Sequence, residues 1–465
     1  MSAFHGRAKH VLMVTSTLVR GGCERQMLAT TTGLLQRGYT VGIFTLANAP
    51  PGEPTFEAEF AALGVKVSCA DGCGDMAPPA DGPQGNMAGG AYGLGPFMPL
   101  IAHLNVVRLG AAVAQAIRMF RPVIVHCWSE PATVIAGLAA SALGVPRILL
   151  QLVNVSPLQR GVAEVQLYRD AYHLLLRNPD AVLLNISRTN ARALEQWLEV
   201  PEGTVKLLYN GFLPHSVQVR KRRRIAESRR RIGLAPKAPV VGAVMRFAPE
   251  KDPELWLETA AIVAAARPDV RFVLAGYGEL AESILRKAKL LGLADRLALF
   301  GPKADVGAIY AVMDLFLMTS RFEGTPNVLI EAQAAGVPVV APPVGGLGEA
   351  MRDGLTGRLV AERTAVKIAE AVLQMLDDPR WRRRAARLGP KFVSSRFKLR
   401  RKIDRTIGFY DYGRAAPTSD LHVMLGSLAA RLQSAAAFWL NWLRRQRLPA
   451  ADDEPVLIPH RMNLR

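Results

Sequence analysis

The stretch LFLMTSRFEGTPNVLIEAQAAGVPVVAPPVGGLGE (315–349) contains two short apolar runs with a longer helix-like segment between them. LFLMTS (315–320) and VPVVAP (337–342) are short apolar runs next to turn residues, which is typical of buried strands. The segment between them, NVLIEAQAA (327–335), is long enough to form a helix that connects two neighbouring strands. A strand, a helix and a second strand in this order predict a parallel sheet covered by helices.

The turn into this helix carries the signals of a helix start. Gly324 allows the chain to turn, Thr325 is a candidate N-cap, and Pro326 suits the first helical position. Gly336 suits the left-handed conformation that often ends a helix. Because free backbone N–H groups and the helix dipole attract anions, we expect a diphosphate at the start of this helix.

The same alternation fills most of the chain. Strand-like runs alternate with amphipathic stretches such as 24–37, 106–120 and 131–143. The expected fold class is α/β, with two Rossmann-like doubly wound parallel-sheet domains facing an interdomain cleft. The predicted strands are 10–16, 40–47, 65–70, 123–128, 147–153, 181–187 and 205–210, followed by 240–245, 270–276, 296–301, 315–320, 337–342 and 357–361.

Breaks in this pattern set the expected domain boundaries. The alternation stops in the Arg- and Lys-rich segment 214–237 and resumes with PVVGAVMRF. Residues 71–99 are rich in Gly, Pro and Met, as expected for a long loop insertion. The predicted organisation is an N-terminal domain (1–213) completed by 396–412, a C-terminal domain (238–395), and a tail (413–465) with an amphipathic helix.

The composition narrows the classes of partner. Lys and Arg outnumber Asp and Glu by 58 to 39 in the 465 residues, and the resulting formal charge of +19 favours anionic partners. Nucleotides and acidic lipid surfaces fit this charge, whereas no recognition helix or aromatic-interleaved basic strand points to nucleic acid. The four cysteines are too few for a disulfide framework and lack partners for a zinc site. Without a signal-like leader or an apolar run of about 20 residues, we expect a cytoplasmic protein.

Charged residues gather at the predicted carboxyl ends of the second domain's strands, where ligands bind on such folds. Glu323 directly precedes the helix start, and Glu331 lies one turn after Asn327 on the same helix face. Carboxylates in these positions can accept hydrogen bonds from sugar hydroxyls beside the expected diphosphate. Arg246 and Lys251 follow the domain's first strand and can neutralise the diphosphate charge. Asp252 is the expected cap of the helix that follows, and Pro253 opens that helix.

Two glycines occupy the corresponding position in the first domain. Gly21 and Gly22, in LVRGGCERQ, lie between the first strand and the first helix. Glycines at this point let the backbone approach a phosphate or a sugar closely, and a plain turn is the alternative.

Taken in order, these residues resemble the family-four retaining glycosyltransferases of the GT-B fold. The resemblance covers about 10–412 and is strongest from 240 to 360. It implies that the first domain is the acceptor side and that the second binds a nucleotide-sugar donor. The matching marks are the GGxER loop at Gly21–Arg25, the NG turn at Asn210–Gly211, Arg246 with Lys251, AGYGE at 275–279, and the E-x7-E pair Glu323 and Glu331.

The resemblance also implies roles for single residues. Arg246 and Lys251 would bind the donor pyrophosphate, Glu331 the ribose and Glu323 the donor sugar. His126, in VIVHCW, matches the strand-end histidine that many members direct toward the donor sugar. The expected catalytic residues are Arg246, Lys251, Glu323 and His126, and the expected donor-binding residues are Gly21, Gly22, Gly276, Gly324, Thr325, Asn327 and Glu331.

The activity implied is retaining transfer of a hexose from a UDP- or GDP-type nucleotide-sugar to a lipid-linked or polysaccharide acceptor. The acceptor hydroxyl would attack from the face that the diphosphate leaves, so the protein supplies positioning and electrostatic stabilisation. We expect no cofactor beyond the nucleotide-sugar and no metal site. Two alternatives stay open: a sugar-nucleotide epimerase or hydrolase on the same fold, and a non-catalytic nucleotide-sugar-binding membrane protein.

Some features have simpler explanations as well. His126 also fits a histidine whose hydrogen bonds are satisfied inside the core. The basic run 220–231 fits either a solvated helix face or contact with the inner face of an anionic membrane, and the basic run 380–402 also suggests that membrane contact. The tail helix, with Trp439 and Trp442, fits either a docked helix or a membrane anchor.

Overall fold

The computed structural model describes residues 9–72, 98–153, 155, 165–212, 229–230, 235, 238–302 and 305–411. Both sheets belong to one compact unit. Most of the predicted 71–99 insertion and the tail from residue 412 onward lie outside the described residues, as do Cys73 and the basic run at 220–228.

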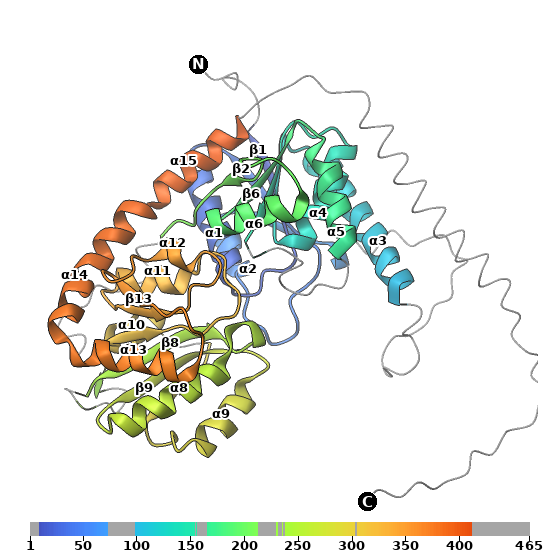
Figure 1. Cartoon of the computed structure of the whole chain (residues 1–465). Coiled ribbons are helices and arrows are strands. Elements are labelled where there is room, and N and C mark those ends of the chain that lie inside the picture. The colour runs from blue at the N-terminus through green and yellow to red at the C-terminus, as the bar shows by residue number, and fades with distance from the viewer. Residues whose placement is uncertain are drawn as a thin grey trace, which may run out of the picture. The chain divides into compact units, whose positions relative to one another are not determined.

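The first domain contains a parallel sheet of seven described strands in the order β3-β2-β1-β4-β5-β6-β7 (Figure 1). His10 aligns with Thr40 and Val11 with Ile124, so β1 lies between β2 and β4. The strands are β1 (His10–Thr15), β2 (Thr40–Thr45), β3 (Lys66–Cys69), β4 (Ile124–Trp128), β5 (Ile148–Leu152), β6 (Ala181–Asn185) and β7 (Lys206–Leu207). Each coincides with a run predicted from the sequence, because these runs are apolar and must be buried on both faces.

Helices cover both faces of this sheet. Val11 and Met13 pack with Met27 and Phe60 on one face, whereas the alternate residues of the strands pack on the other. The helices are α1 (Gly22–Leu35), α2 (Glu57–Ala62), α3 (Met98–Phe120), α4 (Glu130–Ala142), α5 (Val165–Leu176) and α6 (Arg188–Leu198). The α3 helix begins at Met98, inside the segment predicted to be loop and earlier than the predicted 106–120.

The second domain repeats the plan with the order β10-β9-β8-β11-β12-β13. Its strands are β8 (Val240–Arg246), β9 (Arg271–Tyr277), β10 (Leu297–Phe300), β11 (Leu315–Leu317), β12 (Val339–Ala341) and β13 (Gly357–Leu359). Its helices are α8 (Pro253–Ala266), α9 (Ala281–Leu290), α10 (Val306–Val312), α11 (Asn327–Ala334), α12 (Leu347–Ala350), α13 (Ala365–Asp377) and α14 (Pro379–Arg396). Two Rossmann-like sheets of the same order confirm the expected fold class.

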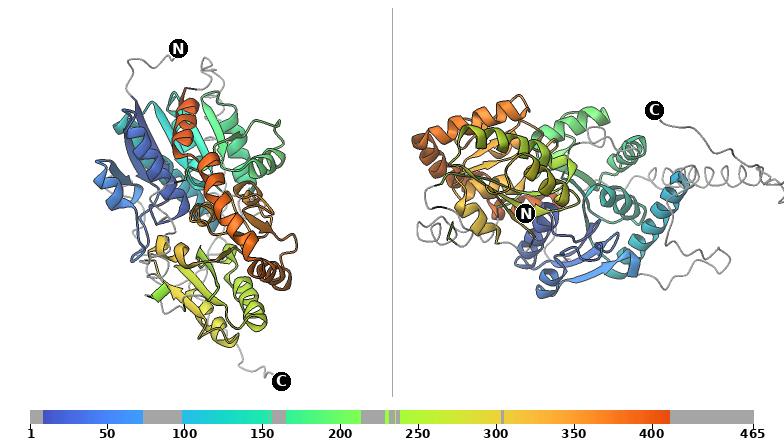
Figure 2. Two further views of the ribbon diagram at one scale, coloured as in Figure 1. Left: turned by 90° about the vertical axis from the view of Figure 1, so that its left-hand side faces the viewer. Right: turned by 90° about the horizontal axis from the view of Figure 1, so that it is seen from below.

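The chain then returns to the first domain in α15 (Leu399–Tyr410). Figure 2 shows α14 and α15 following one another along the two domains. Arg37, just after α1, donates to Asp404 at 2.6 Å, and Ile403 fills the space where Gly33 has no side chain. Residues 399–410 therefore pack on the first domain although they follow the second in sequence.

Three expectations about local structure are wrong. The α11 helix begins at Asn327 with Pro326 as its N-cap residue, so Pro326 precedes the first helical position. Thr325 is not the cap, because its hydroxyl donates to the Ile186 carbonyl at 2.7 Å instead. Arg229, which the sequence placed in a solvated basic run, is buried and pairs with Asp314 at 2.9 Å. Gly336, in contrast, has the expected left-handed conformation with φ of 74°.

Candidate active site

The turn before α11 lies tightly against the first domain. A Cβ on Gly324 would stand 2.1 Å from the Val153 carbonyl oxygen, so this position has no room for a side chain. Asn210, of the NG turn, donates to the Thr325 carbonyl at 3.0 Å. The first domain therefore holds in place the turn that leads into the start of α11.

Lys251 and Glu323 form an ion pair beside this turn. Lys251 lies in the 3-10 turn after β8, and its Nζ stands 2.8 Å from Glu323 Oε1. The same oxygen accepts from Ser320 Oγ at 2.7 Å, and Glu323 is 7% exposed. Arg246 ends β8 and is exposed to solvent. The expected pyrophosphate and sugar residues thus come from adjacent loops of one domain.

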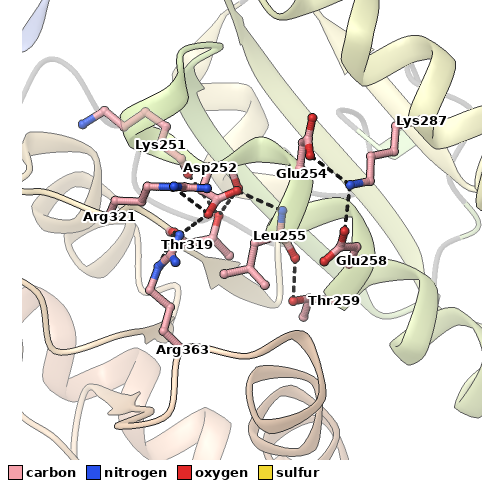
Figure 3. Close-up of polar contacts among 10 residues, drawn as sticks. All are labelled: Lys251, Asp252, Glu254, Leu255, Glu258, Thr259, Lys287, Thr319, Arg321 and Arg363. Carbon is pink, nitrogen blue, oxygen red and sulfur yellow. Dashed lines mark hydrogen bonds and ion pairs between the residues drawn. The ribbon is translucent and has the colours of Figure 1, made fainter.

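Asp252 connects the two loops that carry this pair (Figure 3). Its buried carboxylate accepts from Arg321 Nε at 3.0 Å and also pairs with Arg363. It accepts from the Leu255 N–H at 3.2 Å, which confirms the predicted cap of α8. Thr319 Oγ1 donates to the Asp252 carbonyl at 3.0 Å. Asp252 therefore fixes the neighbouring Lys251 relative to the loop that contains Glu323.

Glu331 is buried and has partners on both of its carboxylate oxygens. Arg25 Nη1, from α1 of the first domain, lies 2.5 Å from Oε1, and the Tyr310 hydroxyl donates to Oε2 at 3.0 Å. Burial raises the pKa of Glu331, whereas the Arg25 charge opposes that shift. Arg25 belongs to the GGxER loop, but no sequence pattern pairs it with a residue in the other half of the chain.

The GGxER loop (Gly21–Arg25) contacts the start of α11 directly. Asn327 Nδ2 donates to the Gly22 carbonyl at 3.0 Å, and Gln26 Nε2 donates to Asn327 Oδ1 at 3.0 Å. Tyr277, at the end of β9, donates to the Arg20 carbonyl at 2.5 Å. The structure thus brings together Gly22 and Asn327, two of the expected donor-binding residues. Gln26 joins this contact, and Tyr277 binds the neighbouring Arg20.

Glu24 is a further group that the sequence did not single out. A Cβ on Gly21 would stand 2.4 Å from Glu24 Oε2, so this carboxyl folds over the first turn of α1. Burial raises the pKa of Glu24 to about 7, and the Arg246 charge acts to lower it. Glu24 therefore lies in the electrostatic field of the expected phosphate-binding cation.

Gly276 has a visible packing role. A Cβ there would stand 1.9 Å from the Met245 carbonyl oxygen, so β8 and β9 could not approach as they do. Contact between Gly276 and a donor stays a prediction.

His126 is fully buried in the first domain. Its Nδ1 lies 3.1 Å from the Tyr410 hydroxyl and its Nε2 lies 3.0 Å from Gln151 Oε1. Burial lowers the pKa of His126 to about 3, so the imidazole is neutral near pH 7. Both ring nitrogens have first-domain partners, which favours the core role over contact with a donor sugar.

Glu349 forms a second contact between the domains, which was not predicted from the sequence. Its carboxylate accepts from the Thr189 N–H at 2.8 Å, at the start of α6, and from the Tyr209 hydroxyl at 2.6 Å. These hydrogen bonds lower the pKa of Glu349 despite its burial. The start of a helix after Ser187 could have indicated a site for a carboxylate, because helix N-termini attract negative charge. The sequence did not indicate that Glu349, 160 positions away from Thr189, would be that carboxylate.

The described residues contain neither a metal-binding cluster nor a membrane-spanning helix. No cluster of three His, Cys, Asp or Glu side chains there could hold a metal ion. Within the same residues, no helix has both the length and the apolar character needed to cross a membrane.

Two family models match the chain in succession. Residues 21–211 match the glycosyl transferase 4-like domain, and residues 224–392 match the glycosyl transferases group 1 domain. With the two Rossmann-like sheets, these matches show a GT-B fold whose two halves each match a glycosyltransferase domain.

Particular relatives support this class. The chain is 32% identical over 250 residues to the Vi polysaccharide biosynthesis protein VipC/TviE of Salmonella typhi, which covers 52% of this chain and 42% of that relative. It is 28% identical over 399 residues to the D-inositol 3-phosphate glycosyltransferase of Segniliparus rotundus, covering 79% and 80%. The first match therefore spans less than half the length of that relative.

Solved structures share the fold. Anabaena HepE in complex with UDP has a TM-score of 0.67 at 21% identity, over 86% of this chain and 98% of that one. The lipopolysaccharide biosynthesis glycosyltransferase WaaG has a TM-score of 0.65 at 16% identity, over 87% and 100%.

Proposed function

We propose that this glycosyltransferase moves a hexose from a nucleotide-sugar donor of the UDP or GDP type and retains the donor's anomeric configuration. The observation that carries this proposal is the Lys251–Glu323 ion pair beside the start of α11. A cation and a buried carboxylate adjoin there, next to the exposed Arg246. HepE has been solved with UDP-glucose, which favours a uridine nucleotide as the first donor to test.

The proposed roles follow from charge. Lys251 and Arg246 bind the diphosphate and stabilise it as negative charge accumulates on the leaving oxygen. Glu323 accepts hydrogen bonds from the donor sugar, and Glu331 accepts them from the ribose. The acceptor hydroxyl forms its bond to the anomeric carbon on the face from which the diphosphate departs, and its proton passes to a phosphate oxygen of the leaving group. Positioning and preorganised charge then supply the rate acceleration.

The test begins with a thermal-shift screen against UDP-, GDP- and ADP-sugars, since a bound donor raises apparent stability by mass action. Lys251→Ala and Arg246→Ala should each raise the barrier to donor turnover by about 2–4 kcal/mol and keep the fold. Wild-type turnover rates in both variants would contradict this donor site.

A lipid-linked or polysaccharide acceptor is the second part of the proposal. It draws on the name of the Salmonella typhi relative, a polysaccharide biosynthesis protein. Analysis of the sugar product separates transfer from the alternatives. An epimerised or hydrolysed donor sugar in the presence of glycan acceptors, without a new glycosidic bond, would favour an epimerase or a hydrolase. Donor binding without turnover would favour a non-catalytic binding protein.

We further propose that the enzyme works in the cytoplasm, as a peripheral protein on the inner face of an anionic membrane. Support comes from α14 and α15, whose basic side chains are mostly exposed. A hollow beside α15 is also lined mainly by basic residues. The exposed set is Arg380, Arg383, Arg384, Arg387, Lys391, Arg396, Lys398, Arg400, Arg401 and Arg405.

A further inference from the structure

Lys402 differs from the other basic residues of α15 because it is buried, with 3% of its surface exposed. Its Nζ donates to Gln26 Oε1 at 2.9 Å, to the Gln26 carbonyl at 3.2 Å and to Thr30 Oγ1 at 2.9 Å. The ammonium also lies 5.0 Å from the centre of the Trp128 ring. Three ammonium protons thus meet three neutral acceptors. Among the described residues no carboxylate pairs with this charge, and a buried charge without a counter-ion is costly.

Gln26 connects this ammonium to the rest of the site. Its Oε1 accepts from Lys402 and from the Gly211 N–H at 2.9 Å. Its Nε2 donates to the Gly211 carbonyl at 2.7 Å and to Asn327 Oδ1 at 3.0 Å. Every polar position of the buried amide is therefore engaged, and its orientation is fixed.

The chain of hydrogen bonds ends at the two elements that face the expected donor. Asn327 is the first residue of α11, and its Nδ2 donates to the Gly22 carbonyl at 3.0 Å. The path runs from Lys402 of α15 through Gln26 of α1 to Asn327 of the second domain. It returns from there to the glycine loop of the first domain.

We propose that Lys402 is a positioning residue for glycosyl transfer: its ammonium fixes Gln26 and thereby holds Asn327 at the start of α11 against Gly22. The inference rests on the proposed function, since it assumes that the donor binds at these two elements. Lys402 touches no reacting atom in this scheme. Its positive charge lies beside Gln26 and Thr30 of α1, one to two turns after that helix start.

The protonation state of Lys402 follows from the groups around it. Burial lowers its pKa to about 7, and the nearby Cys23 opposes that shift. Burial raises the pKa of the Cys23 thiol and lowers that of His126 to about 3, so both stay neutral near pH 7. Glu24, which acts electrostatically on Cys23, has a pKa of about 7 and also titrates in this range. Gln26, Thr30, Trp128 and Tyr410 carry no charge at this pH.

Loss of the proton leaves an amine with two N–H groups for three acceptors. We therefore expect transfer activity to fall as the pH rises through about 7. Stability should change in the opposite direction. The unfolded chain keeps the lysine proton up to its ordinary pKa of 10.5, so the free energy of unfolding contributed by Lys402 rises between about pH 7 and 10.5.

The test compares Lys402→Met with Lys289→Met, an exposed lysine of α9. Methionine fills the space of the lysine stem, and Gln26 Oε1 and the Gln26 carbonyl keep other donors, Gly211 N and Thr30 Oγ1. UDP-glucose, or whichever nucleotide-sugar of the panel turns over, serves as the donor from pH 5.5 to 9. In Lys402→Met we expect kcat/KM at pH 6 to fall roughly tenfold or more and the alkaline decline to disappear, without loss of thermal stability. Lys289→Met should match the wild type.

A second variant keeps the test informative if Lys402→Met misfolds. Thr30→Ala removes one acceptor and keeps the ammonium, so it should lower the pKa of Lys402 further and move the alkaline decline to lower pH. An unmoved decline, or a wild-type pH profile in Lys402→Met, would overturn the inference. If Lys251→Ala is inactive in that case, the proposed function stands without it. If the wild type turns over no nucleotide-sugar, the proposed function fails and the inference fails with it.

Discussion

Glu323 and Glu331 lie on one turn-and-helix segment but have different surroundings. Glu323 pairs with Lys251, a residue of its own domain, at 2.8 Å. Glu331 pairs with Arg25 of the first domain and with Tyr310. The first carboxylate is therefore attached to the expected phosphate-binding cation. The second connects the domains, so a ribose hydroxyl at Glu331 would have to share that carboxylate with Arg25.

This difference predicts separate effects on binding and transfer. Glu331→Ala should weaken the binding of free UDP by roughly tenfold, the value of one charge-assisted hydrogen bond to the ribose. Glu323→Ala should leave UDP affinity near that of the wild type and slow sugar transfer. Calorimetry with UDP and turnover of the donor measure the two effects.

Arg25→Ala is the matched control, because it breaks the contact between the domains and keeps the Glu331 carboxylate. If Arg25→Ala weakens UDP binding as much as Glu331→Ala does, the domain contact explains the effect. If both glutamate variants bind UDP as the wild type does, the ribose role of Glu331 is wrong.

At the scale of elements, Asp252 shows how a helix cap can also position a site residue. Its φ of 48° is left-handed, a conformation that favours Asn, Asp and Gly over other residues. Asp252→Ala should lower the free energy of unfolding by about 2 kcal/mol, because the cap is lost and because alanine is strained in a left-handed conformation. Asp252→Asn should keep most of the stability, because Asn can cap the helix and adopt this conformation. Both variants lose the ion pairs with Arg321 and Arg363, so kcat/KM for the donor should fall in both.

Asp378 offers a control of the same kind on α14. It accepts from the Trp381 N–H at 2.8 Å as the N-cap of that helix. Asp378→Ala should cost about 1 kcal/mol by chemical denaturation and leave donor turnover unchanged. Equal effects of the two Ala variants on turnover would show that Asp252 acts only through stability.

Elements defined by local pattern were predicted from the sequence, and those defined by distant partners were not. The described strands match the apolar runs, because a strand buried on both faces needs apolar residues throughout. Asp252 caps α8 as expected, since the cap depends on a residue three positions away. Thr325 failed as a cap because the Ile186 carbonyl, from the other domain, binds its hydroxyl.

The candidate site divides along the same line. Lys251 and Glu323 were expected together because they follow neighbouring strands of one sheet. The Arg25–Glu331 pair joins residues 306 positions apart, and no local pattern specifies such a contact. Lys402 belonged to a basic run that suggested contact with an anionic membrane, and only the packing of α15 on α1 shows that it is buried.

At the scale of the whole molecule, the most basic described surface to which we assign a role is formed by α14 and α15. Lys402 faces inward, whereas the arginines in the middle of α14 face solvent. The formal charge of +19 is therefore concentrated in part on one pair of helices. Such a surface fits the anionic membrane of the proposed function, since each basic residue near a charged bilayer contributes about 1 kcal/mol.

The corresponding prediction is salt-dependent binding to anionic lipid vesicles. In flotation at low salt, the wild type should bind vesicles that contain phosphatidylserine and should bind neutral vesicles much less. Raising the salt shortens the Debye length to several ångströms and should release the protein. The triple variant Arg383→Glu, Arg384→Glu, Arg387→Glu should lose this binding, whereas Arg286→Glu with Lys289→Glu on α9 should keep it. Equal recovery on neutral and anionic vesicles would contradict the electrostatic contact. Deletion of 413–465 tests the tail separately: loss of binding would assign the anchor to those residues, and retained binding would assign it to α14 and α15.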